Sequence, residues 1–272
     1  MNRDQLIKTI RDKGSFLCVG LDPDPEKLPP GHSGPEGILK FNKAIIDAVR
    51  PYAAAFKPNT AFYEAMGAAG WEILGETLEY IGPEHFTIAD AKRGDIGNTS
   101  RMYARTFFET YQFDAVTVAP YMGSDSVGPF LSFPEKWAVV LALTSNAGAD
   151  DFQLCENSHG VPLYARVITE AAAWGSPENL MFVAGATRPE MFGALRERAP
   201  EHFFLVPGVG AQGGSLAQVC RYGLNEDVGL LVNSSRGILY ASREKDFAEA
   251  AAAEAARIAE EMKSILRRKS LL

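Results

Sequence analysis

The sequence predicts an α/β protein with the (β/α)8 TIM-barrel fold, built as a single domain from residues 1–272. Eight apolar runs of strand length recur along the chain, and their apolar residues are nearly continuous, as in strands buried on both faces. Most of these runs are followed by a segment with helical spacing. A strand followed by a helix, eight times over, favours a closed parallel barrel.

The predicted strands are bounded by glycine, proline and polar residues. In chain order they cover residues 16–22, 53–59, 86–92, 115–120, 137–145, 180–187, 203–210 and 228–235. The segments after the first and fifth strands, around residues 23–34 and 146–160, are predicted to be loops.

Helical spacing is clearest after the first, second and third strands, and it is strongest in the last helix of the chain. The N-terminal segment, before the first predicted strand, has the apolar spacing of a short amphipathic helix. Ser242 is the predicted N-cap of the last helix. The internal helices are predicted at residues 35–50, 61–80 and 98–111. One face of the last helix carries Phe247, Ala251, Ala255, Ile258, Met262 and Ile265.

Composition narrows the possible partners and cofactors. The net charge is −7, so the overall field offers no reason to expect nucleic acid or a membrane surface as a partner. Three widely spaced cysteines without a C-x-x-C motif predict neither a disulfide framework nor a thiolate zinc site. Without a predicted signal peptide or membrane span, we expect a cytoplasmic protein.

Charged residues stand where several predicted strands end. Lys57 ends the second strand, and Asp90 and Lys92 end the third. Active sites of barrels are built at these carboxyl ends, and residues two apart on a strand point to the same face. We therefore expect these three charges to share one cavity mouth. The alternative is that these charges form a solvated or salt-bridged rim of the barrel.

The last two strands predict a phosphate site. "PGVGAQGGS" follows the seventh and "NSSRGI" the eighth, and together they supply backbone N–H groups, a Gln amide and an Arg. The letters "GVGAQG" also match the dinucleotide fingerprint, although the acidic residue expected at the end of the next strand is missing. Glycines that only form tight turns are a further alternative. The four histidines show no metal-binding spacing and are predicted to lie on the surface, and "LTSNAG" lacks the serine-hydrolase elbow.

The stretch "DAKRGDIGNTS" resembles the signature of the orotidine 5'-phosphate decarboxylase family, in particular its longer bacterial branch. The supporting segments "GLDPDP", "FKPN", "PGVGAQGG" and "NSSRGI" are similar to that family in the same order. The resemblance implies a barrel homodimer that converts orotidine monophosphate to uridine monophosphate and CO2, the last step of de novo UMP synthesis. It implies no metal and no organic cofactor.

Carried over residue by residue, the resemblance implies a catalytic array of Lys57, Asp90, Lys92 and Asp95. Asp95 would reach the neighbouring subunit's site together with Ile96 and Thr99. Asp22 and Lys57 would contact the ribose, and Ser145 the pyrimidine. The remaining substrate-binding residues are expected near the phosphate and are Pro207, Gln212, Arg236 and Gly237.

The chemistry explains these residue types. Loss of CO2 leaves negative charge on a ring carbon, so a fixed cation is needed there. Lys92 can both stabilise that charge and donate a proton to the carbon. Three alternatives stay open. They are a magnesium-dependent sugar-phosphate enzyme related to hexulose-phosphate synthase, a Schiff-base aldolase using Lys57 or Lys92, and a catalytically silent barrel that binds a phosphate metabolite.

Overall fold

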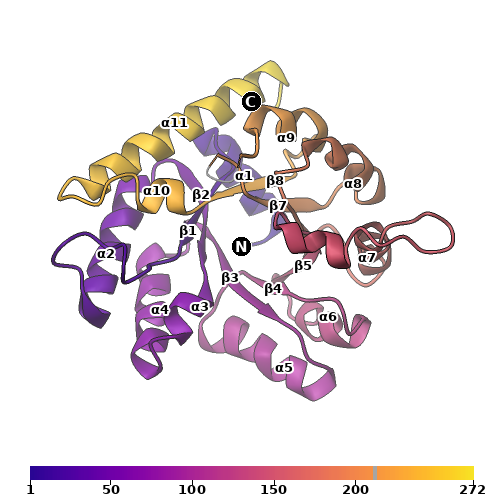
Figure 1. The fold of residues 1–272 in the computed structure, drawn as a ribbon, viewed down its shortest axis with the longest axis horizontal. Helices are drawn as coiled ribbons and strands as arrows, with labels where there is room; N and C mark the ends of the chain where they lie inside the picture. The colour runs from indigo at the N-terminus through magenta and orange to yellow at the C-terminus, as the bar shows by residue number, and fades with distance from the viewer. Residues whose placement is uncertain (211–212) are drawn as a thin grey trace. The chain divides into compact units, whose positions relative to one another are not determined.

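The computed structural model describes residues 1–210 and 213–272, and its eight strands form a closed barrel in the order β1 to β8 (Figure 1). All eight predicted strands are present, although most end one to three residues earlier than predicted, and the (β/α)8 fold is confirmed. The strands are β1 Leu17–Leu21, β2 Ala53–Pro58, β3 Phe86–Arg93, β4 Ala115–Val118, β5 Trp137–Leu143, β6 Leu180–Ala184, β7 Phe203–Pro207 and β8 Leu230–Ser234.

Helices follow every strand of the barrel. They are α1 Arg3–Lys13, α2 Gly34–Val49, α3 Thr60–Glu64, α4 Ala68–Ile81, α5 Gly97–Arg105, α6 Ser124–Leu131, α7 Leu163–Ala172, α8 Phe192–Arg198, α9 Leu216–Gly223, α10 Arg236–Leu239 and α11 Phe247–Arg268. Shorter helical turns are η1 Thr106–Thr110, η2 Ala147–Asp151 and η3 Pro189–Met191. Within the described ranges, none of these helices is long and apolar enough to cross a membrane.

The chain divides into two compact units. The first contains Met1, Gln5–Ala91 and Ser234–Leu272. In it β1 pairs in parallel with β2 and β2 with β3, and every residue of β1 and β2 is buried. The long helix α11 packs against α2 and β1, with its predicted apolar face buried (Figure 1). The continuous apolar runs thus correspond to strands covered on both faces.

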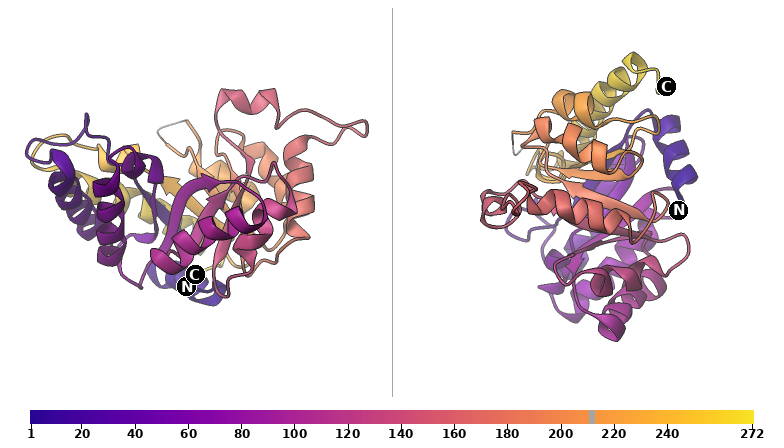
Figure 2. Two further views of the ribbon diagram at one scale, coloured as in Figure 1. Left: turned by 90° about the horizontal axis from the view of Figure 1, so that it is seen from below. Right: turned by 90° about the vertical axis from the view of Figure 1, so that its right-hand side faces the viewer.

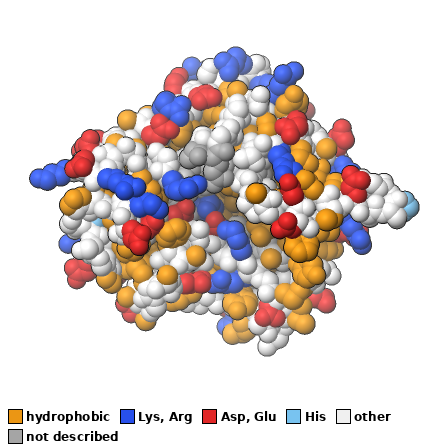
Figure 3. Space-filling view, viewed as in Figure 1, with side chains coloured by type: hydrophobic (Ala, Val, Ile, Leu, Met, Phe, Trp, Pro, Cys, Tyr) orange, Lys and Arg blue, Asp and Glu red, His pale blue; other side chains and the backbone are white. Residues whose placement is uncertain are grey.

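The second unit contains Asn2–Asp4 and Lys92–Asn233. Its strands pair in parallel from β4 to β5, β6, β7 and β8. The loop between η2 and α7 extends away from the neighbouring helices of this unit (Figure 2), and residues 155–160 in it are exposed. Side chains of both charge signs are scattered over the face seen in Figure 3.

The structure corrects two helix predictions. The helix predicted at 61–80 is two helices, because the chain turns at Gly67, where φ is 65°, and Gly70 packs against the main chain of Tyr63. A Cβ on Gly70 would lie 1.8 Å from the carbonyl oxygen of Tyr63, so only glycine permits this turn. The last helix begins at Phe247, and Ser242 lies upstream, donating a hydrogen bond to Asp246 Oδ1 at 2.6 Å.

The closed strand order also bears on the dinucleotide fingerprint. That motif works in an open, doubly wound sheet, where the crevice at the switch in strand order holds the cofactor. Here "GVGAQG" follows β7 in a closed barrel, and α9 begins only at Leu216. The open-sheet crevice on which the nicotinamide alternative depends is therefore missing.

Two histidines predicted to lie on the surface are buried. The exposed fractions of His85 and His202 are 2% and 6%. Each precedes a strand and packs against an aromatic ring, with centroid distances of 5.1 Å between His85 and Phe56 and 5.4 Å between His202 and Phe182. Burial is the main cause that lowers the pKa of each imidazole to about 4. The surface prediction was wrong for these two because strand neighbours cover them.

This burial predicts a loss of stability in mild acid. The folded-state pKa of His202 lies below the ordinary value of 6.5, so the unfolded chain takes up the proton first. The full stability is present above about pH 6.5 and declines as the pH falls toward 4, by up to about 1.4 kcal/mol per pH unit for each histidine. We expect His202→Leu to reduce this slope, measured as the free energy of urea unfolding between pH 7 and 4.5.

The control is His159→Leu. His159 is exposed in the loop before α7, so its replacement should leave the slope unchanged. Neither ring nitrogen of His202 has a hydrogen-bond partner among the described residues, so leucine removes the titrating group without breaking a hydrogen bond. An unchanged slope in His202→Leu would contradict the assignment.

Candidate active site

The first unit brings together Lys57 and Asp90 at the carboxyl ends of neighbouring strands. Lys57 lies on β2 with 4% of its surface exposed, and its Nζ donates to Asp90 Oδ2 at 2.5 Å. Asn59, two residues after Lys57, forms a parallel bridge with Asp90, which aligns the two strand ends. The burial of both side chains contradicts the solvated form of the rim alternative for this pair, whereas the ion pair agrees with its salt-bridged form.

The electrostatic environment keeps Lys57 charged. Burial alone would lower the pKa of Lys57, but the negative charges of Asp90 and Asp22 outweigh it and raise the pKa above its usual value. The thiol of Cys18, on β1, lies in the same environment, and burial raises its pKa to about 12. A lysine that stays protonated is a poor nucleophile, which disfavours a Schiff base at Lys57.

Asp22 directly follows β1 and offers an unused acceptor. Its Oδ1 is buried and has no hydrogen-bond partner among residues 1–210 and 213–272. Buried polar atoms are nearly always hydrogen-bonded, and exceptions call for an explanation. A hydroxyl group of a bound ligand could donate to this oxygen.

Lys92 opens the second unit and has an unusual backbone. Its φ is 47°, in the left-handed region that costs a non-glycine residue on the order of 1–3 kcal/mol and that recurs at functional sites. Its N–H donates to Thr117 Oγ1 at 2.9 Å, and its side chain is exposed. The prediction that Asp90 and Lys92 share a face assumed regular strand dihedrals, and the structure departs from them at Lys92.

Asp95, Ile96 and Thr99 lie at the start of α5. Asp95 Oδ1 accepts a hydrogen bond from the N–H of Ile96 at 2.8 Å, which shapes the turn into the helix. Ile96 is 54% exposed and Thr99 is also exposed. Next to them, the guanidinium carbon of Arg93 lies 5.5 Å from the centroid of the Tyr103 ring. Ile96 and Thr99 are therefore accessible from outside the unit, whereas Asp95 and Arg93 are half-buried.

Ser145 follows β5 in a tightly packed turn. A Cβ on Gly185, the residue after β6, would lie 2.7 Å from the main-chain nitrogen of Ser145, so the position requires glycine. The side chain of Gln153 accepts from the N–H of Thr144 at 2.8 Å and donates to Thr144 Oγ1 at 2.9 Å. The sequence reasoning missed Gly185 and Gln153, although a glycine at a strand end signals a close approach of the backbone.

The predicted phosphate residues fall in both units. Pro207 ends β7 in the second unit, while Arg236 and Gly237 begin α10 in the first, with the Arg236 side chain exposed. Gln212 lies outside the described residues. The loop after β7 uses part of its N–H groups internally, because those of Gly210, Gly213 and Gly214 donate to carbonyls within the loop. Fewer of its amides are free than the sequence suggested.

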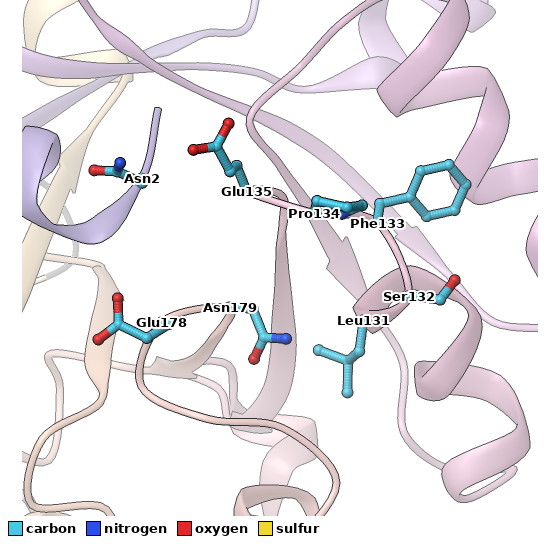
Figure 4. A pocket seen from close by; sticks show the side chains of 8 residues that line it. All are labelled: Asn2, Leu131, Ser132, Phe133, Pro134, Glu135, Glu178 and Asn179. Atoms are coloured by element: carbon cyan, nitrogen blue, oxygen red, sulfur yellow. The ribbon is translucent and has the colours of Figure 1, made fainter.

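A cavity of about 390 Å³ lies elsewhere in the second unit (Figure 4). It is lined by Asn2, Leu131, Ser132, Phe133, Pro134, Glu135, Glu178 and Asn179. Glu135 and Lys136 immediately precede β5, so this part of the lining is at the amino end of that strand. None of the predicted site residues lines this cavity, and it is not the candidate active site.

Comparison with known proteins shows which family this chain belongs to. Proteins named orotidine 5'-phosphate decarboxylase from Phocaeicola vulgatus and Flavobacterium johnsoniae are 54% and 55% identical to this chain, each over 98% of it and 99% and 98% of their own lengths. The structure of Leishmania donovani OMP decarboxylase superposes with a TM-score of 0.85 at 37% identity, covering 97% of this chain and 99% of the other. A sequence model described as the orotidine 5'-phosphate decarboxylase / HUMPS family matches residues 15–252. With its closed barrel, its buried Lys57–Asp90 pair and these relatives, this chain belongs to the orotidine 5'-phosphate decarboxylase / HUMPS family.

Proposed function

We propose that this protein decarboxylates orotidine 5'-phosphate to uridine 5'-phosphate and CO2, the last step of UMP synthesis. The observation that carries the proposal is the buried Lys57–Asp90 pair next to the unused oxygen of Asp22, in a chain 54% identical to proteins named for this activity. A charged lysine, a carboxylate and a free acceptor at strand ends suit a polar, anionic substrate better than an apolar one.

Substrate binding is assigned to side chains at or just after the carboxyl ends of several strands. Asp22 and Lys57 would hold the ribose hydroxyls, since one offers an acceptor and the other three donors. Ser145 would contact the pyrimidine. The phosphate would be met by Pro207, Gln212, Arg236 and Gly237, of which the guanidinium supplies the positive charge. Binding energy from the remote phosphate can be used to orient the ring for reaction.

The chemical step requires a cation where charge develops. When the bond from the ring carbon to the carboxylate breaks, its electron pair stays on the carbon and CO2 leaves. We assign Lys92 to stabilise this carbanion and then to protonate it, which replaces the carboxylate with hydrogen and leaves a neutral amine. Asp90 would face the substrate carboxylate, and the repulsion between them would be relieved as CO2 departs. No step in this mechanism calls for a metal or an organic cofactor.

A homodimer would complete each site. In this proposal Asp95, Ile96 and Thr99 reach the site of the partner subunit. Exposed apolar side chains in the same unit support a protein interface there, since such side chains are normally covered. Besides Ile96 they are Met102 at 51%, Tyr121 at 94% and Met122 at 46% exposed. The Met122 side chain lies close to Gly94, next to the predicted interface turn.

The family description also names HUMPS proteins, so the magnesium-dependent sugar-phosphate reaction related to hexulose-phosphate synthase is the second candidate. Decarboxylation and this second reaction differ in their need for a metal ion, which a chelator tests. We further propose that residues 1–272 form one barrel domain and that the enzyme is cytoplasmic, where its free cysteines Cys18, Cys155 and Cys220 would remain reduced.

The test follows the ultraviolet absorbance of orotidine 5'-phosphate mixed with chelator-treated protein. We expect loss of the orotate-type absorption, with UMP as the product and an unchanged rate when chelator is present. Activity that disappears with chelator and returns with magnesium would contradict the cofactor-free mechanism. Binding of the nucleotide without turnover would instead favour the silent phosphate-binding barrel.

A further inference from the structure

The hydroxyl group of Tyr240 ties down the loop that carries Asp22. It donates a hydrogen bond to the carbonyl oxygen of Asp22 at 2.8 Å and accepts one from the N–H of Asp24 at 2.8 Å. One side chain thus satisfies an acceptor and a donor on the two sides of Pro23. The main chain that carries the Asp22 carboxylate is held on both sides by a residue 218 positions away in sequence.

Tyr240 is itself well anchored. It caps α10, since its N–H donates to the carbonyl of Arg236 at 3.2 Å, and its ring stacks on Phe41 of α2 with an interplanar angle of 14°. Burial raises the pKa of Tyr240 to about 12, so the hydroxyl keeps its proton at ordinary assay pH. A rigid, protonated phenol is a suitable support for a neighbouring loop.

The group that Tyr240 would orient is the carboxylate of Asp22. Its Oδ1 is buried and has no partner within the described ranges, and its charge contributes to the raised pKa of Lys57. A buried acceptor without a hydrogen bond destabilises the free protein, and a ligand that donates a hydrogen bond to it removes this cost. Its value for binding depends on its direction, because hydrogen bonds weaken steeply when they are misaligned.

We propose that Tyr240 is a positioning residue that directs the carboxylate of Asp22 toward the ribose hydroxyls and so sets the preference of the enzyme for a ribonucleotide. The inference rests on the proposed function, in which Asp22 contacts the ribose. Tyr240 acts through Asp22 and does not itself touch the substrate. Tyr240 also caps α10, which begins with Arg236. It therefore links the loop that carries Asp22 to the helix that carries Arg236, the residue assigned to the phosphate.

The test compares Tyr240→Phe with the unchanged enzyme on three substrates, orotidine 5'-phosphate and its 2'-deoxy and 3'-deoxy analogues. The unchanged enzyme should prefer the ribonucleotide to at least one deoxy analogue by about 100-fold or more in kcat/KM. In Tyr240→Phe we expect kcat/KM for the ribonucleotide to fall about 10-fold, mainly through KM, and that for the analogue to fall less than about 2-fold. The preference therefore shrinks.

Two controls separate positioning from stability. Tyr80→Phe removes a comparable hydroxyl in the same unit, one that donates to Asp47 at 2.7 Å, and should leave the preference unchanged. Asp22→Ala should abolish the preference. Adding Tyr240→Phe to Asp22→Ala should change kcat/KM less than about 2-fold further, because Tyr240 acts only by orienting the Asp22 carboxylate, which is then missing. The preference is a ratio measured on one sample, so a smaller folded fraction does not alter it.

If Tyr240→Phe fails to fold, Phe41→Leu provides the second test, because it removes the stacking partner of Tyr240 and leaves the hydroxyl in place. We expect a smaller fall in the same ratio. An equal fall for all substrates, or an unchanged preference, would overturn the role of Tyr240. An unchanged enzyme that does not decarboxylate orotidine 5'-phosphate would instead refute the proposed function, whatever the variants do.

Discussion

Replacing Lys92 with alanine should lower kcat for orotidine 5'-phosphate by at least about 10³-fold and leave the dissociation constant of UMP within a few-fold. The size follows from the loss of both a general acid and a charge that stabilises the carbanion. UMP lacks the carboxylate, so its affinity depends on the ribose and phosphate contacts and not on Lys92. The measurements are the absorbance change on decarboxylation and calorimetric titration with UMP.

The left-handed backbone at Lys92 does not complicate this comparison, because alanine and lysine both carry a Cβ and share its strain. Lys8→Ala is the matched control. Its side chain is 74% exposed and pairs with the nearby Asp12 on α1, so both activity and UMP affinity should be unchanged. Near-normal turnover in Lys92→Ala would remove the residue from its assigned role.

Mixing inactive Lys92→Ala subunits with inactive Asp95→Ala subunits should restore activity. If Asp95 acts across the interface, each heterodimer has one site in which both residues are intact and one in which both are missing. Random exchange of equal amounts makes half of the dimers heterodimers, so about a quarter of the normal activity should return. The recovery should be measured after subunit exchange under mild denaturing conditions.

The control mixture contains Lys92→Ala and Asp90→Ala subunits. Both residues are assigned to the same subunit's site, so neither site of that heterodimer is complete and no activity should return. If the first mixture stays inactive although exchange is shown by mass-labelled subunits, Asp95 does not act in the partner's site. If both mixtures recover, Asp95 acts across the interface as proposed, but the assignment of Asp90 and Lys92 to the same subunit's site is wrong.

Much of the fold could be predicted from the sequence because the barrel strands are buried on both faces. Such strands require continuous apolar runs, and eight of these runs alternating with helical spacing leave few architectures open. The candidate charges were predictable for a related reason. A strand that ends in Asp90 after the apolar "FTIA" places a charge where the core meets the ligand face, and its pairing with Lys57 follows from the adjacency of β2 and β3.

Local features that depend on close packing were not predictable. The apolar spacing of residues 61–80 continues through the turn at Gly67, so periodicity could not reveal that Gly70 packs on the main chain of Tyr63. His85 and His202 look like surface residues in sequence, and only neighbouring strands and rings bury them. Likewise, Ser242 looks like an N-cap, but the helix begins at Phe247.

The sequence by itself determined the barrel, the family resemblance and the set of charged residues at the strand ends, because these depend on residue types in linear order. The tertiary structure decided what those residues do to one another. It placed Asp90 against Lys57, left one oxygen of Asp22 without a partner, and set Tyr240 to hold the Asp22 loop from 218 residues away. Contacts of that kind depend on distance and direction in space, which residue order alone does not specify.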